Sequence, residues 1–180
     1  MNDNDHKPVL LVIDVQNGFL GSKTQQVVPK VKILTEQWIQ TGHDVVFTQF
    51  VNVPGGQYEK LIGWKRLQNP PETDIHAELV PFARKIIHKN YYSAFTDEFR
   101  DLLRQNRWNT FVICGIATDS CVLKTAVDAF ELGFTPLVVS DACASHGGED
   151  VHVAAITILK RFIGRNQITE SSLVFERINV

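Results

Sequence analysis

A cysteine and an aspartate, far apart in the sequence, each follow a short apolar segment in a way that suggests nucleophilic chemistry. Residues 110–114 form one apolar run, and the helical pattern that begins near Thr118 places Cys121 in its first turn. Unpaired backbone N–H groups at a helix N-terminus favour a thiolate. Asp14 closes the other apolar run, residues 8–13. A thiol and a carboxylate at the carboxyl ends of parallel strands are typical of a nucleophile with its own base, which indicates an enzyme.

Each of these residues also has a purely structural interpretation. A free cysteine is most often a small buried hydrophobe, and Cys114 and Cys143 fit that role. Asp14 precedes the turn-rich residues 15–18 (VQNG), where an aspartate often caps a turn. For Cys121 the helix terminus favours catalysis, and we expect its thiol pKa to lie below the usual value of about 8.5.

Apolar segments alternate with amphipathic ones along the chain, which predicts a doubly wound α/β fold with helices on both faces of the sheet. Several of the apolar segments are continuously apolar, as parallel strands covered on both faces are. The whole chain is expected to form one domain, residues 1–180, in which residues 1–7 are a frayed tail. The expected strands are residues 9–13, 44–48, 85–88, 110–114, 135–139 and 167–169, and the expected helices are residues 26–40, 96–106, 119–132 and 149–162.

One long segment, residues 50–83, contains several prolines and glycines and shows no regular pattern. A structureless stretch of this length inside a compact domain is usually functional. Its aromatic side chains are candidates for covering a pocket, while the simplest alternative is that Trp64 packs on the core. Tyr58, Trp64 and Leu67 are also candidates for an interface between subunits.

The composition excludes several classes of function. A formal net charge of −2 gives no electrostatic basis for binding nucleic acid or an anionic membrane, and no apolar run reaches the roughly 18 residues of a transmembrane helix. Three cysteines without a Cys-x-x-Cys pair fit neither a disulfide framework nor a zinc knuckle. Since free thiols are typical of a reducing compartment, we expect a cytoplasmic protein that acts on a small molecule.

Four motifs resemble the isochorismatase-like cysteine hydrolases, a superfamily that includes nicotinamidases, N-carbamoylsarcosine amidohydrolases, ureidoacrylate and biuret hydrolases, and isochorismatases. The motifs are residues 11–19 (LVIDVQNGF), 89–95 (KNYYSAF), 114–122 (CGIATDSCV) and 140–145 (SDACAS). One such motif is a weak signal, whereas four in the same order and spacing are a strong one. The resemblance covers about residues 9–169 and implies a sheet of six parallel strands in the order 3-2-1-4-5-6.

For the site, the resemblance implies a triad of Asp14, Lys89 and Cys121, with Cys121 as the nucleophile. The role of Lys89 rests on the resemblance alone, because a lysine at the end of an apolar segment is usually solvated. The resemblance also implies an oxyanion hole formed by the backbone N–H groups of Ala117 and Cys121. It further implies a cis peptide bond between Ile116 and Ala117.

We expect no metal and no other cofactor. Nicotinamidases carry an Asp-x-His motif after the second strand, with further histidines downstream, and these residues bind a divalent metal. The corresponding residues here are 48–52 (TQFVN). His76 alone is too little for a site, since three or four ligands are the norm, and His152 is interpreted as structural. An amidase of unassigned substrate is therefore favoured over a nicotinamidase.

The predicted function is cysteine-dependent hydrolysis of a C–N bond in a small amide, carbamoyl or ureido compound through a thioester, by a homodimer or homotetramer. Phe19, Trp64 and Tyr92 are the candidate pocket residues. A competing hypothesis is a hydrolase of a non-amide bond, of the isochorismatase type, in which Asp14 is a general acid and Cys121 is idle. The sequence is also compatible with a metal-free nicotinamidase-like enzyme and with a catalytically silent binding protein, because a fold does not guarantee a function.

Overall fold

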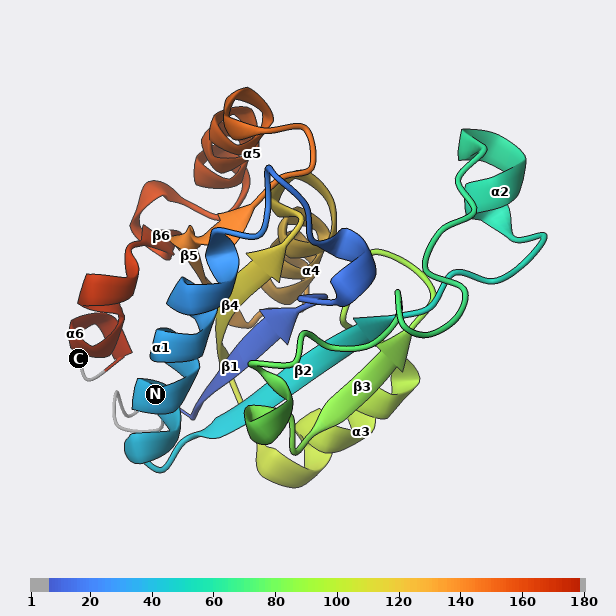
Figure 1. The fold of residues 1–180 in the computed structure, drawn as a ribbon. Coiled ribbons are helices and arrows are strands. Elements are labelled where there is room, and N and C mark those ends of the chain that lie inside the picture. The colour runs from blue at the N-terminus through green and yellow to red at the C-terminus, as the bar shows by residue number, and fades with distance from the viewer. Residues whose placement is uncertain (1–6, 179–180) are drawn as a thin grey trace.

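The apolar segments of the chain form the strands of one parallel sheet (Figure 1). In the computed structural model, which describes residues 7–178, the order of the strands is β3-β2-β1-β4-β5-β6, as expected. The two central strands are buried at every position, because helices cover both faces of the sheet. The strands are β1 (Pro8–Ile13), β2 (Asp44–Phe50), β3 (Ile86–Lys89), β4 (Thr110–Ile116), β5 (Thr135–Ala144) and β6 (Ile168–Thr169).

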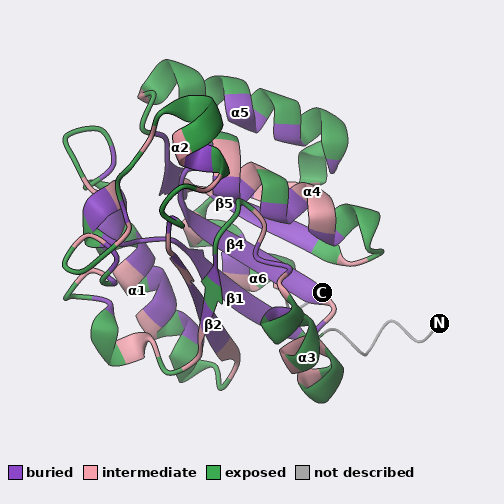
Figure 2. Cartoon of the chain, turned by 90° about the vertical axis from the view of Figure 1, so that its right-hand side faces the viewer, coloured by how far each residue is buried: buried purple, intermediate pink, exposed green. Residues whose placement is uncertain are grey.

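Helices form a layer on each side of this sheet. The main helices are α1 (Val27–Gln40), α3 (Asp97–Asn106), α4 (Leu123–Glu131), α5 (Glu149–Phe162) and α6 (Val174–Ile178). On one face α1 and α6 are neighbours, with the rings of Trp38 and Phe175 6.0 Å apart. On the other face lie α3, α4 and α5 (Figure 1). Figure 2 shows that the strands between these layers are buried, whereas the outer faces of the helices are exposed.

The expected frayed tail, residues 1–7, lies outside the described residues except for Lys7. The Lys7 N–H donates to Asn109 Oδ1 over 2.9 Å, and its carbonyl accepts from the Asn109 N–H over 3.1 Å. Lys7, the residue before β1, is therefore held in place by hydrogen bonds to Asn109. Within residues 7–178, no helix combines the length and the apolarity that crossing a membrane requires.

The segment of residues 50–83 is not structureless, so that expectation was wrong. It contains α2 (Gln57–Ile62), which stands beyond the carboxyl ends of β2 and β3 in Figure 1. Phe50, Tyr58 and Leu67 form a hydrophobic cluster of their own, against which Trp64 packs. The buried amide of Asn52 donates to two carbonyls of the segment, over 3.1 Å each. The segment is therefore ordered by a small core and a buried polar anchor.

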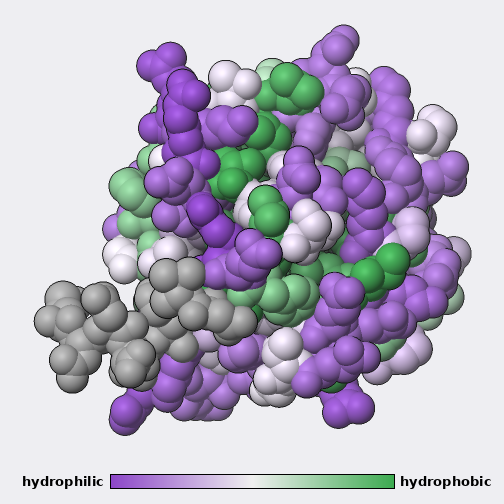
Figure 3. All heavy atoms as spheres, turned by 90° about the vertical axis from the view of Figure 1, so that its left-hand side faces the viewer, coloured by the Kyte–Doolittle hydropathy of each residue, from purple (hydrophilic) through white to green (hydrophobic). Residues whose placement is uncertain are grey.

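The residues expected at an interface between subunits are mostly internal. Tyr58 and Leu67 are buried within their own chain, and Trp64 is only half-exposed. On the face that Figure 3 shows, hydrophobic side chains lie in small groups among hydrophilic ones. The expected homodimer or homotetramer therefore stays a prediction. Tyr58 and Leu67 give no support for its interface, because they are buried within their own chain.

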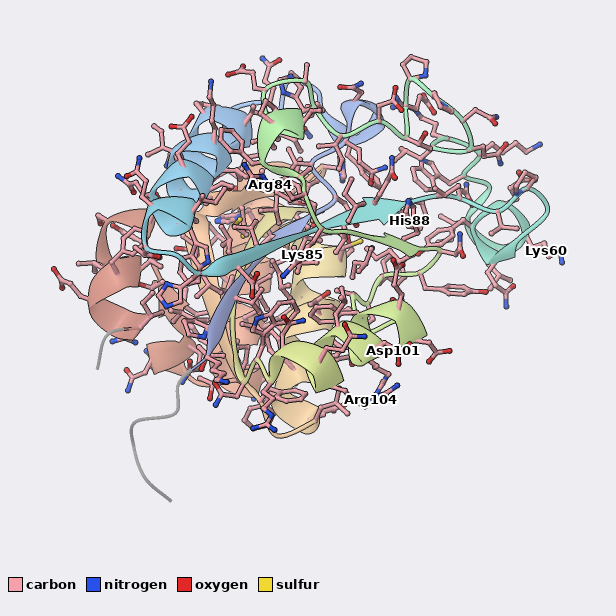
Figure 4. All side chains as sticks on the ribbon, turned by 90° about the horizontal axis from the view of Figure 1, so that it is seen from below. Lys60, Arg84, Lys85, His88, Asp101 and Arg104 are labelled. Atoms are coloured by element: carbon pink, nitrogen blue, oxygen red, sulfur yellow. The ribbon has the colours of Figure 1, made fainter. Side chains whose placement is uncertain are left out.

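Charged side chains line β3, the end strand of the sheet. Figure 4 shows Lys85 and His88 along this edge and Asp101 and Arg104 on the neighbouring α3. Lys85 Nζ lies 2.5 Å from an oxygen of Asp44, and Arg104 pairs with Asp101. Charged side chains on an end strand oppose pairing with the strand of another molecule. Two cations of this edge, Lys85 and Arg104, are thus each paired with a carboxylate.

Gly115 allows β1 and β4 to approach each other closely where both strands end. Its φ is +119°, and a Cβ atom at this position would lie 2.1 Å from the carbonyl oxygen of Ile13. The pairing of β4 with β5 also changes register between Ile113 and Gly115, so β5 continues to Ala144. Cys143 therefore lies in a strand, opposite Gly115, although the expected strand ended at residue 139.

We predict that Gly115→Ala lowers the free energy of unfolding by more than about 4 kcal/mol, because the methyl group would clash with backbone atoms that cannot move away. Gly133→Ala is the matched control: Gly133 also has a positive φ, +82°, but nothing lies within 4 Å of an added Cβ. Its cost should be about 1–2 kcal/mol of backbone strain. Urea unfolding of both variants measures the difference, and equal losses would contradict the role given to the close approach.

Candidate active site

Three side chains from separate strands converge at the carboxyl edge of the sheet. Asp14 follows β1, Lys89 ends β3, and Cys121 lies in a helical turn after β4. Lys89 Nζ is 2.7 Å from Asp14 Oδ2 and 3.4 Å from Cys121 Sγ. All three residues are buried. The structure therefore brings together the three residues that the sequence motifs single out.

The backbone and one neighbouring strand fix the orientation of Asp14. Its φ of +48° is left-handed, a conformation that aspartate tolerates better than most residues. The Asp14 N–H donates to Thr48 Oγ1 over 3.0 Å, and the Thr48 hydroxyl donates to Asp14 Oδ1. One carboxylate oxygen is thus held by β2, which leaves the other for Lys89.

Lys89 is a buried ammonium whose partners surround it. Its Nζ donates to the carbonyls of Tyr91 and Tyr92 over 2.9 and 3.1 Å, besides contacting Asp14 and Cys121. Burial acts to lower the pKa of Lys89, but the interactions with Asp14 and then with Cys121 outweigh it, so the pKa is raised. Lys89 is therefore charged at neutral pH and can stabilise a second negative charge beside Asp14.

Cys121 lies in a π-helical turn, Thr118–Val122, which precedes α4 instead of forming its first turn. The hydroxyl of Thr118 lies 2.8 Å from Nδ1 of His152, and this contact ties the turn to α5. Burial, and after it the charge of Asp14, raise the pKa of Cys121 to about 12, although Lys89 acts in the opposite direction. The expected low pKa is therefore wrong for the free protein, in which Cys121 is a neutral thiol beside a carboxylate.

The peptide bond between Ile116 and Ala117 is cis, which is the geometry that the family resemblance implies. The Ala117 carbonyl accepts hydrogen bonds from the N–H groups of Ser120 and Val122, over 3.1 Å each. The carbonyl is therefore engaged by the turn that carries Cys121. The assignment of the oxyanion hole to the N–H groups of Ala117 and Cys121 stays a prediction.

A cavity of about 190 Å³ opens beside Cys121 and has mostly aromatic walls. The rings of Phe19 and Trp64 are stacked, with centroids 5.9 Å apart and planes 15° apart. A larger cavity, about 320 Å³, lies at the amino ends of the strands and contains none of the three converging residues. The smaller cavity is lined by Phe19, Phe50, Tyr58, Ile62, Trp64, Tyr92, Ala117, Ser120, Cys121 and His146. The structure thus places all three candidate pocket residues on its wall.

A buried amide, Gln16, supports the site and was not singled out from the sequence. Its Nε2 donates to the carbonyls of Phe50 and Thr73 over 2.9 and 2.7 Å, and its Oε1 accepts from the Phe50 N–H over 2.8 Å. These bonds join the end of β1 to β2 and to the pocket segment, residues 50–83. Its position two residues after Asp14 is the feature of the sequence that could have singled out Gln16, but that segment was interpreted as a turn.

The residues present do not fit the metal site of nicotinamidases. In place of the Asp-x-His motif, the ring of Phe50 packs edge-on against Tyr58, and the Asn52 amide is bound to carbonyls of its own segment. Across the part of the chain that the structure describes, no three His, Cys, Asp or Glu side chains gather in a way that could hold a metal ion. The side chains at this position are thus engaged in packing and in holding the pocket segment.

Comparisons with known proteins identify the family. The isochorismatase domain matches residues 8–169, so the chain belongs to the isochorismatase family. An isochorismatase family protein of Bacillus subtilis, YwoC, is 29% identical, with 96% of each chain covered. A nicotinamidase of Acinetobacter baylyi is 30% identical, with 74% of this chain and 79% of the relative covered. The ureidoacrylate amidohydrolase RutB of the same species is 28% identical, with 90% and 80% covered.

The fold agrees with solved structures of this family. The crystal structure of the nicotinamidase PncA from Bacillus subtilis superposes with a TM-score of 0.80 at 26% identity, and the match covers 91% of this chain and 99% of that one. The family and the fold make this chain a hydrolase of the isochorismatase family.

We predict that iodoacetamide labels Cys121 slowly at pH 7 and that the rate rises with pH to at least pH 10. The reason is the raised pKa of the thiol, since the thiolate is the reacting form. Asp14→Asn removes the negative neighbour and should speed labelling at pH 8 about tenfold, whereas Lys89→Met should slow it. Mass spectrometry of digested protein resolves the sites, and Cys143, whose pKa does not depend on Asp14, is the internal control. A rate plateau below pH 8 would contradict this assignment.

A second prediction concerns the ion pair itself. Lys89→Met leaves the buried carboxylate of Asp14 without its cation and should lower the free energy of unfolding by about 3–5 kcal/mol. Adding Asp14→Asn should recover most of that loss, because the double variant buries no unpaired charge. Urea unfolding of the two single variants and the double variant at pH 7 measures the coupling. Simple additivity of the two losses would show that the charges do not stabilise each other.

Proposed function

We propose that this isochorismatase-family hydrolase cleaves the C–N bond of a small amide, carbamoyl or ureido compound through a thioester on Cys121. The observation that carries the proposal is the contact of Cys121 with a buried Asp14–Lys89 ion pair at the wall of a small cavity. The relatives named nicotinamidase and ureidoacrylate amidohydrolase support the class of bond. Such a cluster supplies a nucleophile, a base and a cation in one place.

The first step uses the neutral state of the thiol. As Sγ of Cys121 attacks the substrate carbonyl carbon, its proton passes to the carboxylate of Asp14. Lys89, 3.4 Å from Sγ, stabilises the negative charge that develops on sulfur. The thiolate thus forms only during the attack, so a low pKa in the free protein is not required.

The carbonyl oxygen of the substrate becomes an oxyanion in this step. We assign its stabilisation to the backbone N–H groups of Ala117 and Cys121, the pair that the family motif indicates. Loss of one such donor typically costs about 3–4 kcal/mol of transition-state stabilisation. The bonds that hold the Ala117 carbonyl against the helical turn would keep the donors in place before substrate arrives.

The remaining steps return the enzyme to its starting state. Protonated Asp14 gives its proton to the leaving nitrogen as the C–N bond breaks, and the acyl group stays on Cys121 as a thioester. Asp14 then takes a proton from water while the water oxygen attacks the thioester carbon. Breaking the C–S bond releases the acid, and the proton returns to Cys121.

The cavity limits the size of the substrate. A volume of about 190 Å³ corresponds to roughly six water molecules, and its walls are mainly aromatic. A compact compound with an apolar or planar body fits this space. The competing hypothesis, in which Cys121 is idle, is disfavoured, because Sγ of Cys121 lies at the cavity wall 3.4 Å from Lys89 Nζ.

We predict that a screen for ammonia release across small amides, ureas and carbamoyl compounds finds a substrate for the wild-type protein. Cys121→Ala should lower kcat/KM for it by at least about 10³-fold, since the covalent route is lost. Cys143→Ala, which removes a buried thiol outside the cavity, is the matched control and should retain activity. Equal activity of the Cys121→Ala variant would rule out the thioester mechanism.

A further inference from the structure

One polar atom in the cavity wall has no partner. Tyr58 lies on α2 and is 8% exposed, and among the described residues its hydroxyl forms no hydrogen bond. The phenol of Tyr92 is close enough to raise the pKa of Tyr58, but the two hydroxyls do not form a hydrogen bond. Buried hydroxyl groups are nearly always hydrogen-bonded, because leaving one unpaired is unfavourable. The hydroxyl of Tyr58 is therefore an exception that calls for a partner from outside the protein.

The position of Tyr58 is fixed by the aromatic side chains around it. Its ring meets those of Phe50, Trp64 and Tyr92 at steep angles, with centroids 5.3–5.7 Å apart. Tyr58 and Cys121 line the same cavity. A side chain packed in this way offers its hydroxyl in one orientation, at little entropic cost when a ligand binds.

The hydroxyl keeps its proton. Burial raises the pKa of Tyr58 far above its usual range, and interactions with Tyr92, Cys121 and Asp14 add to this effect. Tyr92 and Cys121 line the same cavity as Tyr58. The phenol is thus a hydrogen-bond donor at every physiological pH.

The other walls of the cavity are mostly aromatic, and they also carry the hydroxyls of Tyr92 and Ser120 and the indole N–H of Trp64. Phe19 and Trp64 present stacked rings, and Nε2 of His146 already contacts the carbonyl of Phe19 over 3.0 Å. A compact ligand that packs against these rings can present an acceptor atom to Tyr58, which lines the same cavity.

We propose that Tyr58 determines substrate specificity by donating a hydrogen bond to an acceptor atom that the substrate carries in addition to the bond that is cleaved. The acceptor is a ring nitrogen, an ether oxygen or a second carbonyl oxygen. This inference rests on the proposed function, since it concerns the same cavity. Tyr58 is a recognition residue in this account and takes no part in the proton transfers.

Binding of matched pairs of amides tests the proposal. In each pair one compound has an acceptor where the other has a carbon: pyridine-3-carboxamide against benzamide, and methoxyacetamide against butanamide. Calorimetry with the Cys121→Ala protein measures dissociation constants without turnover. In at least one pair the acceptor-bearing compound should bind about tenfold more tightly, as one added hydrogen bond allows.

Adding Tyr58→Phe should abolish this preference, whereas Ser172→Ala, which removes an exposed hydroxyl outside the cavity, should retain it. Three outcomes would overturn the proposal. They are equal binding within both pairs, binding of none of the four compounds, and a preference that survives Tyr58→Phe. Cys121-dependent hydrolysis without any acceptor preference would overturn the role of Tyr58 alone. An acceptor preference without Cys121-dependent hydrolysis would overturn the proposed function alone.

Thermal unfolding separates recognition from a structural role. Tyr58→Phe keeps the ring and removes only the unpaired hydroxyl, so the Tm of the ligand-free protein should rise, by about 2–4 °C. A fall in Tm would show that the hydroxyl has a partner within the protein, and it would overturn the proposal. With any substrate found in the screen, Tyr58→Phe should raise KM and leave kcat nearly unchanged.

Discussion

The buried ion pair of Asp14 and Lys89 is the interaction on which the rest of the site depends. Two charges removed from water are tolerated only when they face each other and when their other polar atoms are also bound. Here the separation is 2.7 Å, Thr48 holds the carboxylate, and the carbonyls of Tyr91 and Tyr92 hold the ammonium. The strand order makes this possible, because β1 and β3 end at the same edge of the sheet with only β2 between them.

This pair decides the chemical state of the nucleophile. Cys121 faces a negative and a positive charge in a buried position, and burial together with the carboxylate outweighs the ammonium. The thiol therefore stays neutral until a carbonyl carbon is in reach, which protects it from reacting with other electrophiles. The hydroxyl of Tyr58 is also unfavourable in the free protein, because it is buried without a hydrogen-bond partner. A bound ligand would supply that partner.

The sequence predicted the strands, their order and the convergence of the triad, because continuous apolar segments and four ordered motifs are local signals. The pKa of Cys121 was predicted with the wrong sign, since a helix terminus is visible in a sequence but the depth of burial is not. The order of the pocket segment was missed because it arises from packing of Phe50 against Tyr58 and from hydrogen bonds of the Asn52 side chain, and neither produces a regular pattern in the sequence. Gln16 was missed because a buried amide within a turn pattern resembles a solvated one.

The central claim is that the substrate becomes covalently attached to Cys121 through a carboxylate-assisted attack. Its most direct test is mass spectrometry of the wild-type protein quenched with acid during turnover. The peptide containing Cys121 should gain the mass of the substrate less that of the released ammonia or amine. Steady turnover with this peptide unmodified, under quenching that preserves thioesters, would contradict it.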